Sequence, residues 1–481
     1  MDPRRFESVI SAADYRALLS LIDRGASALH GRVIWNVNST AHGGGVAELL
    51  RSLLGYSRGG GVDARWLVVS GTPAFFDLTK RLHNHLHGFD GDGGGLTEAE
   101  RSIYEGTMAE NAAELIPLLH PQDIVILHDP QTAGLVDAAR STGAAVIWRC
   151  HVGIDNPNWL ARDAWRFLRP YVLGADAYIF SRATFAWEGL DRDKISVIHP
   201  SIDAFSPKNQ ALTPAQCLSI LGRAGIIAGR HPNHPTFTRG DGTPGRVDRR
   251  ADVLEEAPLD VSDRLVVQVS RWDSLKDPVG VMSGFASHVA DRVDAHLMLA
   301  GPATQSVADD PEGAVVFGQV RDAWHGLPRR LRRRVHLASL PMDDGDENAA
   351  IVNALQRHAD VVVQKSLAEG FGLTVAEAMW KERPVVASAI GGIQDQIVDG
   401  ESGVLLPDPR DLAAFGAAVV AVVEDPERAR RMGAAAHARI VEEFLGPYHL
   451  ERHFEVIERV VAARDKERAM TVWAPSSTSV L

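Results

Sequence analysis

The sequence has 481 residues, of which 45% are hydrophobic and 23% charged, proportions typical of a globular enzyme with two to four domains. The formal net charge of −12 argues against a general nucleic-acid-binding protein, whose surface needs a basic excess. With only Cys150 and Cys217, a disulfide framework and a cysteine-based zinc site are excluded. The first residues lack the apolar core of a signal peptide, and no apolar run approaches the ~20 residues that span a bilayer, so we expect a cytoplasmic protein without a membrane span.

Strands and helices alternate through the N-terminal half. After a helical periodicity over residues 6–30, we predict strands at residues 31–38, 64–70, 123–127, 144–148, 177–181 and 195–203. Strands that alternate with helices form a parallel sheet, so this half is predicted to have an α/β fold.

The first predicted strand runs through Asn38 into a glycine-rich loop, Gly43-Gly44-Gly45, and residues 46–54 then have helical periodicity. Open α/β sheets bind ligands at such strand-to-helix junctions. The helix follows the third glycine directly, so the spacing differs from the dinucleotide-binding pattern. Taken alone, the triple glycine is more often an ordinary turn than a ligand loop.

Two other strands of this half end in polar residues. His128-Asp129-Pro130 follows one strand, and Arg149-Cys150-His151 ends the next. Residues at the carboxyl ends of parallel strands line the ligand crevice, so Asp129 and His151 are candidates for hydrogen bonds to a sugar. The alternative is a capping Asp and a core His.

Three groups of residues have the spacing of metal ligands without the rest of a metal site. His83 and His87 are four apart on one helical face, but no acidic or Cys partner is close in sequence. Asp90-Gly91-Asp92 and Asp344-Gly345-Asp346 lie in glycine loops and are interpreted as chance. We therefore predict no metal site.

Residues 222–252 are rich in Gly, Pro, Arg and His and have little periodicity, so we predict a linker or surface insertion without its own core. A second series of strands follows. We expect them at residues 264–270, 296–301, 335–340, 361–363, 384–388 and 403–406, with helices at 349–357, 411–423, 426–444 and 448–464.

Two cations follow the first strand of this second series. Arg271 and Lys276 are five residues apart just past residues 264–270, and together they can converge on one anion. Arg binds phosphate oxygens bidentately, and Lys binds them as a point charge. A surface Arg and a surface Lys need no such explanation by themselves.

The most informative stretch is Glu369 to Glu377, Glu-Gly-Phe-Gly-Leu-Thr-Val-Ala-Glu, which follows the strand at residues 361–363. Gly370 and Gly372 permit a tight turn, and a helix is expected from Thr374. A strand, a glycine turn and a helix start place free N–H groups and the positive end of a helix dipole at one spot, which suits a phosphate. The two carboxylates could accept hydroxyl hydrogen bonds on either side of it, a layout that matches a sugar–diphosphate–ribose ligand. The alternative is an ordinary strand-to-helix connection.

This stretch resembles the acidic signature of retaining nucleotide-sugar glycosyltransferases with the GT-B fold. The resemblance runs through nearly the whole chain and is closest to trehalose synthases. The segments that carry the closer match are residues 37–40, 43–48, 128–131, 148–151, 200–203, 268–271, 276–278 and 369–381.

The resemblance implies two Rossmann-like domains with parallel sheets that face a central cleft. The expected domains are residues 1–210 for the acceptor, a linker or insertion at 211–255, and residues 256–445 for the nucleotide sugar. Residues 446–470 are expected to form a helix that packs back towards the N-terminal domain, and residues 471–481 a tail.

The resemblance also assigns roles to residues. Arg271 and Lys276 would bind and stabilise the leaving diphosphate, while His151 and Glu369 would contact the donor sugar. Glu377 would bind the ribose, and Asp129 and Asn38 the acceptor. The remaining nucleotide-sugar contacts would come from two glycine-rich turns, at Gly43, Gly44 and Gly45 and at Gly372, Leu373 and Thr374.

The implied reaction moves glucose from a nucleoside-diphosphate glucose to glucose with retention, forming the α,α-1,1 linkage of trehalose. No obvious carboxylate nucleophile is present, which favours same-face attack, with the leaving phosphate taking the acceptor proton. We expect no tightly bound cofactor. Stimulation by Mg²⁺ and a homodimer are both compatible with the sequence.

Two departures from the family pattern matter. Residues 222–252 are longer than the family linker, and residues 342–347 are unusually acidic where base recognition is expected, so ADP, UDP and GDP all remain open as the nucleotide. A trehalose phosphorylase, a transferase to another sugar and a non-catalytic sugar-nucleotide sensor are the alternatives.

Overall fold

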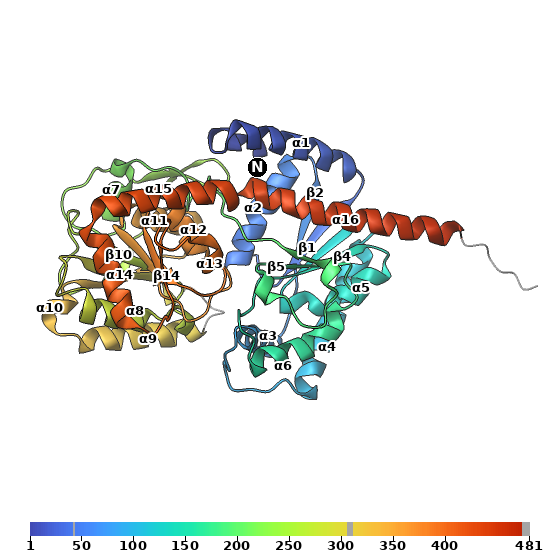
Figure 1. Cartoon of the computed structure of the whole chain (residues 1–481), viewed down its shortest axis with the longest axis horizontal. Coiled ribbons are helices and arrows are strands. Elements are labelled where there is room, and N and C mark those ends of the chain that lie inside the picture. Colours follow the sequence, from blue (N-terminus) through green and yellow to red (C-terminus); the bar gives the residue numbers. More distant parts are fainter. Residues whose placement is uncertain (42–43, 305–310, 474–481) are drawn as a thin grey trace, which may run out of the picture. The chain divides into compact units, whose positions relative to one another are not determined.

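The computed structural model describes residues 1–41, 44–304 and 311–473 (Figure 1). The chain divides into two compact units. Met1–Ser201 and the segment that begins at Gly446 form the first unit, and Ile202–Leu445 forms the second.

The first unit is built on a six-stranded parallel sheet with the order β2-β1-β3-β4-β5-β6. Its strands are β1 (Val33–Asn38), β2 (Asp63–Val68), β3 (Ile124–His128), β4 (Ala145–Cys150), β5 (Ala177–Phe180) and β6 (Ile195–Val197). Its helices are α1 (Ala12–Ala28), α2 (Gly45–Gly59), α3 (Pro73–Leu86), α4 (Glu98–Leu115), α5 (Val136–Ser141), α6 (Trp159–Val172) and α16 (Gly446–Trp473).

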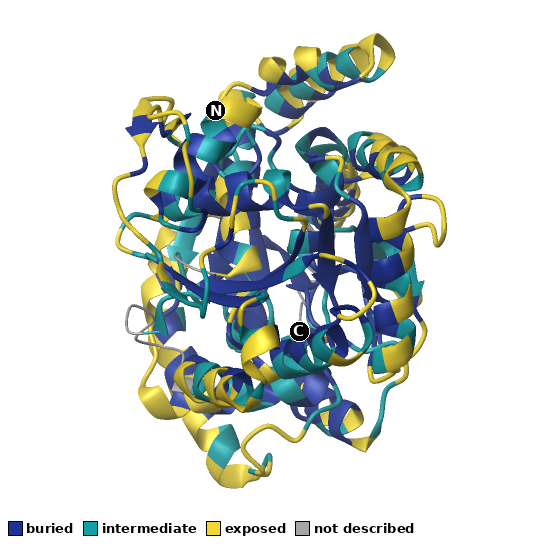
Figure 2. Cartoon of the chain, turned by 90° about the vertical axis from the view of Figure 1, so that its left-hand side faces the viewer, coloured by how far each residue is buried: buried dark blue, intermediate teal, exposed yellow. Residues whose placement is uncertain are grey.

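Side chains alternate between the two faces of this sheet, and one face is more polar than the other. One face carries Trp35, Val125 and Trp148 into the main apolar core, which α3, α4 and α6 also line. Odd and even residues of a strand point to opposite faces, so Asn36, His128 and Arg149 share the other face. Helix α16 contacts α1, α2 and β4. The central strands are buried throughout, as expected for a parallel sheet covered on both faces (Figure 2).

The second unit contains a seven-stranded sheet with the order β15-β14-β13-β10-β11-β12-β9, in which only the β12–β9 pair is antiparallel. Its strands are β9 (Asp252–Leu254), β10 (Leu265–Val269), β11 (His296–Pro302), β12 (Val335–Leu340), β13 (Val361–Gln364), β14 (Val385–Ser388) and β15 (Val404–Leu406). Its helices are α7 (Pro214–Arg223), α8 (Pro278–His288), α9 (Pro311–Gly326), α10 (Arg329–Arg332), α11 (Gly345–His358), α12 (Leu373–Trp380), α13 (Ile393–Gln396), α14 (Leu412–Glu424) and α15 (Pro426–Glu443).

The boundaries of the units differ from the ranges expected from the sequence. The first unit ends at Ser201 rather than at residue 210, and residues 211–255 lie within the second unit rather than in a separate linker. Helix α7 packs on α11, and β9 extends the sheet. Residues 446–470 form part of α16 in the first unit, and this helix continues to Trp473, within the segment expected to be a tail.

Residues 222–252, predicted to lack a core, are anchored to the second unit. A short hairpin of β7 (Thr236–Thr238) and β8 (Pro244–Arg246) buries Phe237, and Val247 follows it into the interior. Strands of three residues are too short for a periodic signal, which is why the sequence pattern missed them.

The anchor is electrostatic as well as apolar. Arg239 donates two hydrogen bonds to Asp344, at 3.1 and 2.7 Å. The buried Glu347 carboxylate accepts hydrogen bonds from the backbone N–H groups of Asp248 and Arg249, both at 2.6 Å. The basic excess of one segment therefore pairs with the acidic residues at 342–347, and the two departures from the family pattern are one structural feature.

Within the described residues, no helix is both long and apolar enough to cross a membrane.

Candidate active site

Two loops at the carboxyl ends of β10 and β13 bring the candidate residues of the second unit together. Lys276 Nζ donates a hydrogen bond of 2.6 Å to Glu369 Oε2. The Leu367 N–H donates to Leu275 O at 2.7 Å, and Gln268 Nε2 donates to Lys276 O at 2.8 Å, so the backbones of both loops are fixed. The carboxylate and the ammonium group, 93 residues apart in sequence, thus form one charged pair at the sheet edge.

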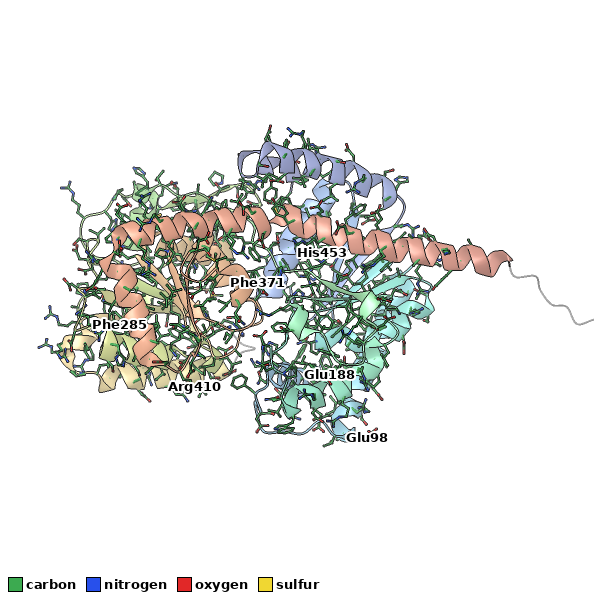
Figure 3. All side chains as sticks on the ribbon, viewed as in Figure 1. Glu98, Glu188, Phe285, Phe371, Arg410 and His453 are labelled. Atoms are coloured by element: carbon green, nitrogen blue, oxygen red, sulfur yellow. The ribbon has the colours of Figure 1, made fainter. Side chains whose placement is uncertain are left out.

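Glycines make the turn between β13 and α12 as tight as the sequence suggests. Gly372 has φ +84° and precedes the first residue of α12 without a side-chain cap. Gly391, in the loop between β14 and α13, packs against this turn. It has φ +46°, and a Cβ atom there would lie 1.8 Å from Glu369 O, so no other residue fits. Phe371 stands within this turn (Figure 3).

The first turn of α12 provides the N–H donors expected there. Leu373 and Thr374 open the helix, where backbone N–H groups have no intrahelical acceptor. Thr374 Oγ1 donates to Gln364 Oε1 at 3.3 Å, which ties the helix start to the end of β13. An anion at this position would meet N–H groups and the positive end of the helix dipole.

Glu377 and Arg271 differ in their exposure. Glu377 is buried on α12 with 2% of its surface exposed, and Lys208 Nζ lies 3.6 Å from its Oε1. The Arg271 side chain is half-exposed and pairs with Asp273 Oδ2 at 3.3 Å. Glu377 is therefore held inside the unit beside Lys208, whereas the Arg271 side chain reaches the surface.

A buried ion pair behind the site was missed from the sequence. Lys365 is fully buried, and its Nζ contacts Asp277 and donates to Pro409 O at 2.7 Å. Asp277, with φ 48°, also caps α8 by accepting from the Gly280 N–H at 3.0 Å. The pair joins the two loops that carry Lys276 and Glu369. A lysine directly after a buried strand was the available signal.

In the first unit, Asp129 is held in an unusual backbone conformation. It has φ 64°, a region that non-glycine residues rarely adopt. The Asp129 N–H donates to Arg149 O at 2.7 Å, and Asp129 Oδ1 accepts from the His151 N–H at 2.7 Å. Burial raises the pKa of the Asp129 carboxyl to about 7, against an ordinary value of 3.8.

His151 stacks beside His128 at the ends of neighbouring strands. His151 Nε2 and His128 Nδ1 lie 3.2 Å apart, and His128 Nε2 lies 3.0 Å from Asn36 Oδ1. Burial, followed by the nearby Arg149 charge, holds the pKa of both imidazoles well below the usual range, so both rings are neutral. His128 and Asn36 were not singled out in the sequence.

The two other candidates of the first unit support its loops. Asn38 Nδ2 donates to Thr40 O at 2.7 Å, and Asn38 Oδ1 accepts from Trp66 Nε1 at 2.7 Å, so its amide is engaged within the protein. Gly44 has φ +77° and leads into α2, which begins at Gly45. Gly43 lies outside the described residues.

A second buried cluster joins α16 to the sheet. Arg149 is fully buried, donates to His449 Nε2 at 3.0 Å and contacts His453 Nε2. His453, on α16, is labelled in Figure 3. Burial lowers the pKa of Arg149 to about 9 and that of both histidines well below normal. The alternation of side chains along β3 and β4 was the signal that could have placed Arg149 on the same face as His128.

The residue groups with metal-like spacing have other partners. Asp92 forms two hydrogen bonds with Arg81, at 2.7 and 2.8 Å, and His87 Nδ1 lies 3.1 Å from Gly153 O. Across residues 1–41, 44–304 and 311–473, no group of three or more His, Cys, Asp or Glu side chains is arranged to hold a metal ion.

Comparison with solved structures defines the class of the protein. The α,α-trehalose-phosphate synthase of Burkholderia xenovorans, solved with glucose-6-phosphate, aligns with a TM-score of 0.65 at 15% identity, covering 89% of this chain and 100% of that one. Trehalose-6-phosphate synthase OtsA aligns with a TM-score of 0.64 at 13% identity, covering 89% and 99%. The chain has the fold of GT-B glycosyltransferases.

Sequence comparison identifies the family. Residues 36–187 match the model of the trehalose synthase N-terminal domain, and residues 345–439 match glycosyl transferases group 1. Trehalose synthase of Pyrococcus horikoshii is 34% identical over 92% of this chain and 95% of its own, and that of Rubrobacter xylanophilus is 34% identical over 90% and 93%. The chain belongs to the trehalose synthase family and is a trehalose-related glycosyltransferase.

Proposed function

We propose that the protein transfers glucose from a nucleoside-diphosphate glucose to glucose and forms trehalose with retention at the anomeric carbon. The observation that carries the proposal is the Lys276–Glu369 contact of 2.6 Å beside the glycine turn and the start of α12. A cation and a helix N-terminus suit a diphosphate, and a carboxylate can accept hydrogen bonds from the hydroxyls of a sugar.

In the second unit, the donor is proposed to lie across the glycine turn. Lys276, Arg271 and the N–H groups of Leu373 and Thr374 stabilise the negative charge on the departing diphosphate. Glu369 accepts a hydrogen bond from a hydroxyl of the donor glucose, and Glu377 accepts from the ribose. The Lys365–Asp277 pair supports the proposal because it holds both loops in place before the donor arrives.

In the first unit, His151 is proposed to hydrogen-bond the donor glucose, and Asp129 to orient the hydroxyl of the acceptor. The bond between the anomeric carbon and the diphosphate oxygen breaks, and a bond to the acceptor oxygen forms on the same face. The acceptor proton passes to the departing phosphate oxygen. We propose no resident cofactor, and any stimulating Mg²⁺ would be bound through the diphosphate.

The test supplies ADP-, UDP- and GDP-glucose, each with glucose and a panel of other sugars, and analyses the product linkage by NMR. We expect a non-reducing α,α-1,1 disaccharide with glucose as acceptor. The Pleurotus sajor-caju trehalose phosphorylase is 25% identical over 78% of this chain and 51% of its own. Turnover that requires orthophosphate would mean that the protein is a phosphorylase and not a synthase. Binding of the donor without turnover would make the protein a sensor.

A further inference from the structure

Three buried polar side chains form a line across the first unit, from the middle of β1 to the end of β4. Asn36 is 2% exposed, His128 is 1% exposed and His151 is 9% exposed. Asn36 pairs in register with Ile126, two residues before His128, so both side chains stand on the same face of the sheet. Two contacts, of 3.0 and 3.2 Å, connect the three side chains.

The direction of these hydrogen bonds follows from the first atom in the line. Asn36 Oδ1 can only accept, so His128 Nε2 carries the hydrogen. A neutral imidazole has one N–H, so His128 Nδ1 is an acceptor, and the hydrogen between the two rings belongs to His151 Nε2. His151 Nδ1 is then left with a lone pair.

We infer that Asn36 and His128 are positioning residues that fix the tautomer of His151, so that His151 Nδ1 accepts a hydrogen bond from a sugar hydroxyl. The inference deepens the proposed function and rests on it for the identity of the sugar. Neither Asn36 nor His128 is proposed to touch the substrate.

The surrounding groups keep His128 and His151 neutral. The charged and titratable groups around His128 and His151 are Arg149 and Asp129 on the sheet and His453 and His449 on α16. The positive charge of Arg149 disfavours a second proton on either ring. Only the neutral tautomers therefore compete.

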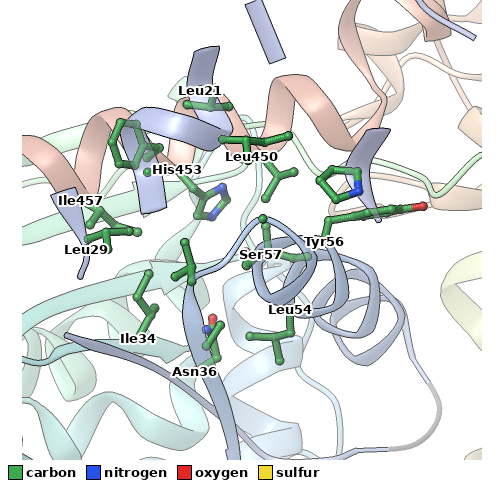
Figure 4. Close-up of a pocket in the computed structure, with 18 of the residues that line it drawn as sticks. Leu21, Leu29, Ile34, Asn36, Leu54, Tyr56, Ser57, Leu450, His453 and Ile457 are labelled. Carbon is green, nitrogen blue, oxygen red and sulfur yellow. The ribbon is translucent and has the colours of Figure 1, made fainter. Parts of the chain in front are cut away.

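Water has little access to the start of the line. Asn36 and His453 are two of the few polar side chains around a cavity of about 80 Å³ in the first unit (Figure 4). Its other walls are mostly apolar, with Leu21, Leu54 and Ile457 among them (Figure 4). Asn36 and His128 are almost fully buried, at 2% and 1% exposure, so the hydrogen bond between them has little competition from solvent.

The direct test reads the tautomers in the unliganded protein. Long-range ¹H–¹⁵N spectra of histidine-labelled protein distinguish protonated from unprotonated ring nitrogens, and His128→Gln and His151→Gln assign the two rings. We expect Nε2 protonated and Nδ1 unprotonated on both. Nδ1 protonated on both rings would mean that the Asn36 amide points the other way and would overturn the inference.

Asn36→Asp should reverse the direction of the hydrogen bonds along the line without changing the shape of the side chain. A carboxylate beside His128 Nε2 favours a doubly protonated His128, whose Nδ1–H then donates to His151 Nε2 and moves the His151 hydrogen to Nδ1. We expect kcat to fall about 10-fold or more, the lower end of the loss seen when the hydrogen-bond partner of a metal-ligating histidine is removed. Full activity with a reversed His151 would also overturn the inference.

Asn233→Asp is the control, because it makes the same chemical change at an exposed position of the second unit. Tautomers and kcat should remain those of the unsubstituted protein. Correct tautomers in a protein that does not make trehalose would refute the proposed function and leave the line intact. The spectra of the unsubstituted protein decide the inference even if Asn36→Asp does not fold.

Discussion

Asp129 is a residue whose charge works against folding. Its carboxyl has a pKa raised from 3.8 to about 7, because burial disfavours the anion. The folded protein therefore retains this proton between pH 4 and 7 while the unfolded chain has lost it. The contribution of Asp129 to stability is full below its ordinary pKa and is lost as the pH rises through about 7.

We predict that Asp129→Asn raises the melting temperature at pH 8 and raises it less at pH 5, while glucosyl transfer is lost. The Asn side chain retains an acceptor for the His151 N–H but cannot become charged. Melting curves across this pH range, with transfer assays at each pH, measure both effects.

Asp92→Asn should behave in the opposite way, because hydrogen bonds from Arg81 lower the pKa of Asp92. Its contribution to stability is present at neutral pH and is lost as the pH falls, so this variant should be less stable at pH 8. Equal melting shifts for the two variants would contradict the sign assigned to Asp129.

Lys276→Ala should reduce kcat by about 10²-fold or more, the scale for removing one electrostatic stabiliser of a developing charge. The substitution also leaves Glu369 without the ammonium group that lies 2.6 Å from it. Steady-state kinetics measures the effect, and Lys466→Ala on the exposed surface of α16 serves as the control. Near-normal turnover of Lys276→Ala would remove Lys276 from the diphosphate site.

At the scale of elements, the β7–β8 hairpin and the first turn of α11 form a single anchored feature. Glu347 is 1% exposed and accepts hydrogen bonds from the backbone of residues 248 and 249. We predict that Glu347→Ala lowers the free energy of unfolding by about 2 kcal/mol or more, because two backbone N–H groups lose their acceptor. Urea unfolding measures the change.

The matched control for this prediction is Glu427→Ala on α15, which removes an exposed pair with Arg430. An exposed ion pair contributes about 0–1 kcal/mol, so the control should unfold nearly as the unsubstituted protein does. Similar small effects for both variants would show that the hairpin is only loosely tied to α11.

Local signals account for what the sequence predicted well. Strand, glycine turn and helix start follow one another between residues 361 and 380, so the turn around Gly372 could be inferred without the fold. The Lys276–Glu369 contact could be expected only because both residues lie in loops that follow neighbouring strands of one parallel sheet.

The parts that the sequence did not reveal depend on distant partners. Arg149 contacts His449 and His453, which lie about 300 residues later in the sequence. Strand β9 pairs with β12, although β10 and β11 lie between them in the sequence. The hydrogen bond from Trp66 Nε1 to Asn38 Oδ1 is another contact of this kind, and the role of Asn38 at the acceptor stays a prediction. Short strands and side-chain pairs of this kind have no periodic signature.

At the scale of the whole molecule, one unit is continuous in sequence and the other is not. Residues 202–445 form the second unit without interruption, whereas the first unit needs both residues 1–201 and α16. Ile202 and Leu445 form a β-bridge, so the chain enters and leaves the second unit at adjacent points.

We predict that residues 202–445, expressed alone, unfold cooperatively in urea, and that residues 1–201 alone do not. Without α16, the sheet face that carries Arg149 lacks its histidine partners and its apolar cover. Joining residue 201 to residue 446 through a short Gly/Ser linker should restore cooperative unfolding, because the ends lie close together. Cooperative unfolding of residues 1–201 by themselves would contradict this dependence on α16.

The discontinuity of the first unit has a consequence for its synthesis on the ribosome. The second unit is fully translated before α16 exists, although the first unit began earlier. At about 5–20 residues per second, the wait between residue 201 and α16 lasts on the order of tens of seconds. During that time Arg149 lacks its histidine partners, and the apolar side chains around Asn36 have α1 and α2 beside them but not α16. The nascent chain therefore offers chaperones a binding surface that disappears once α16 has emerged.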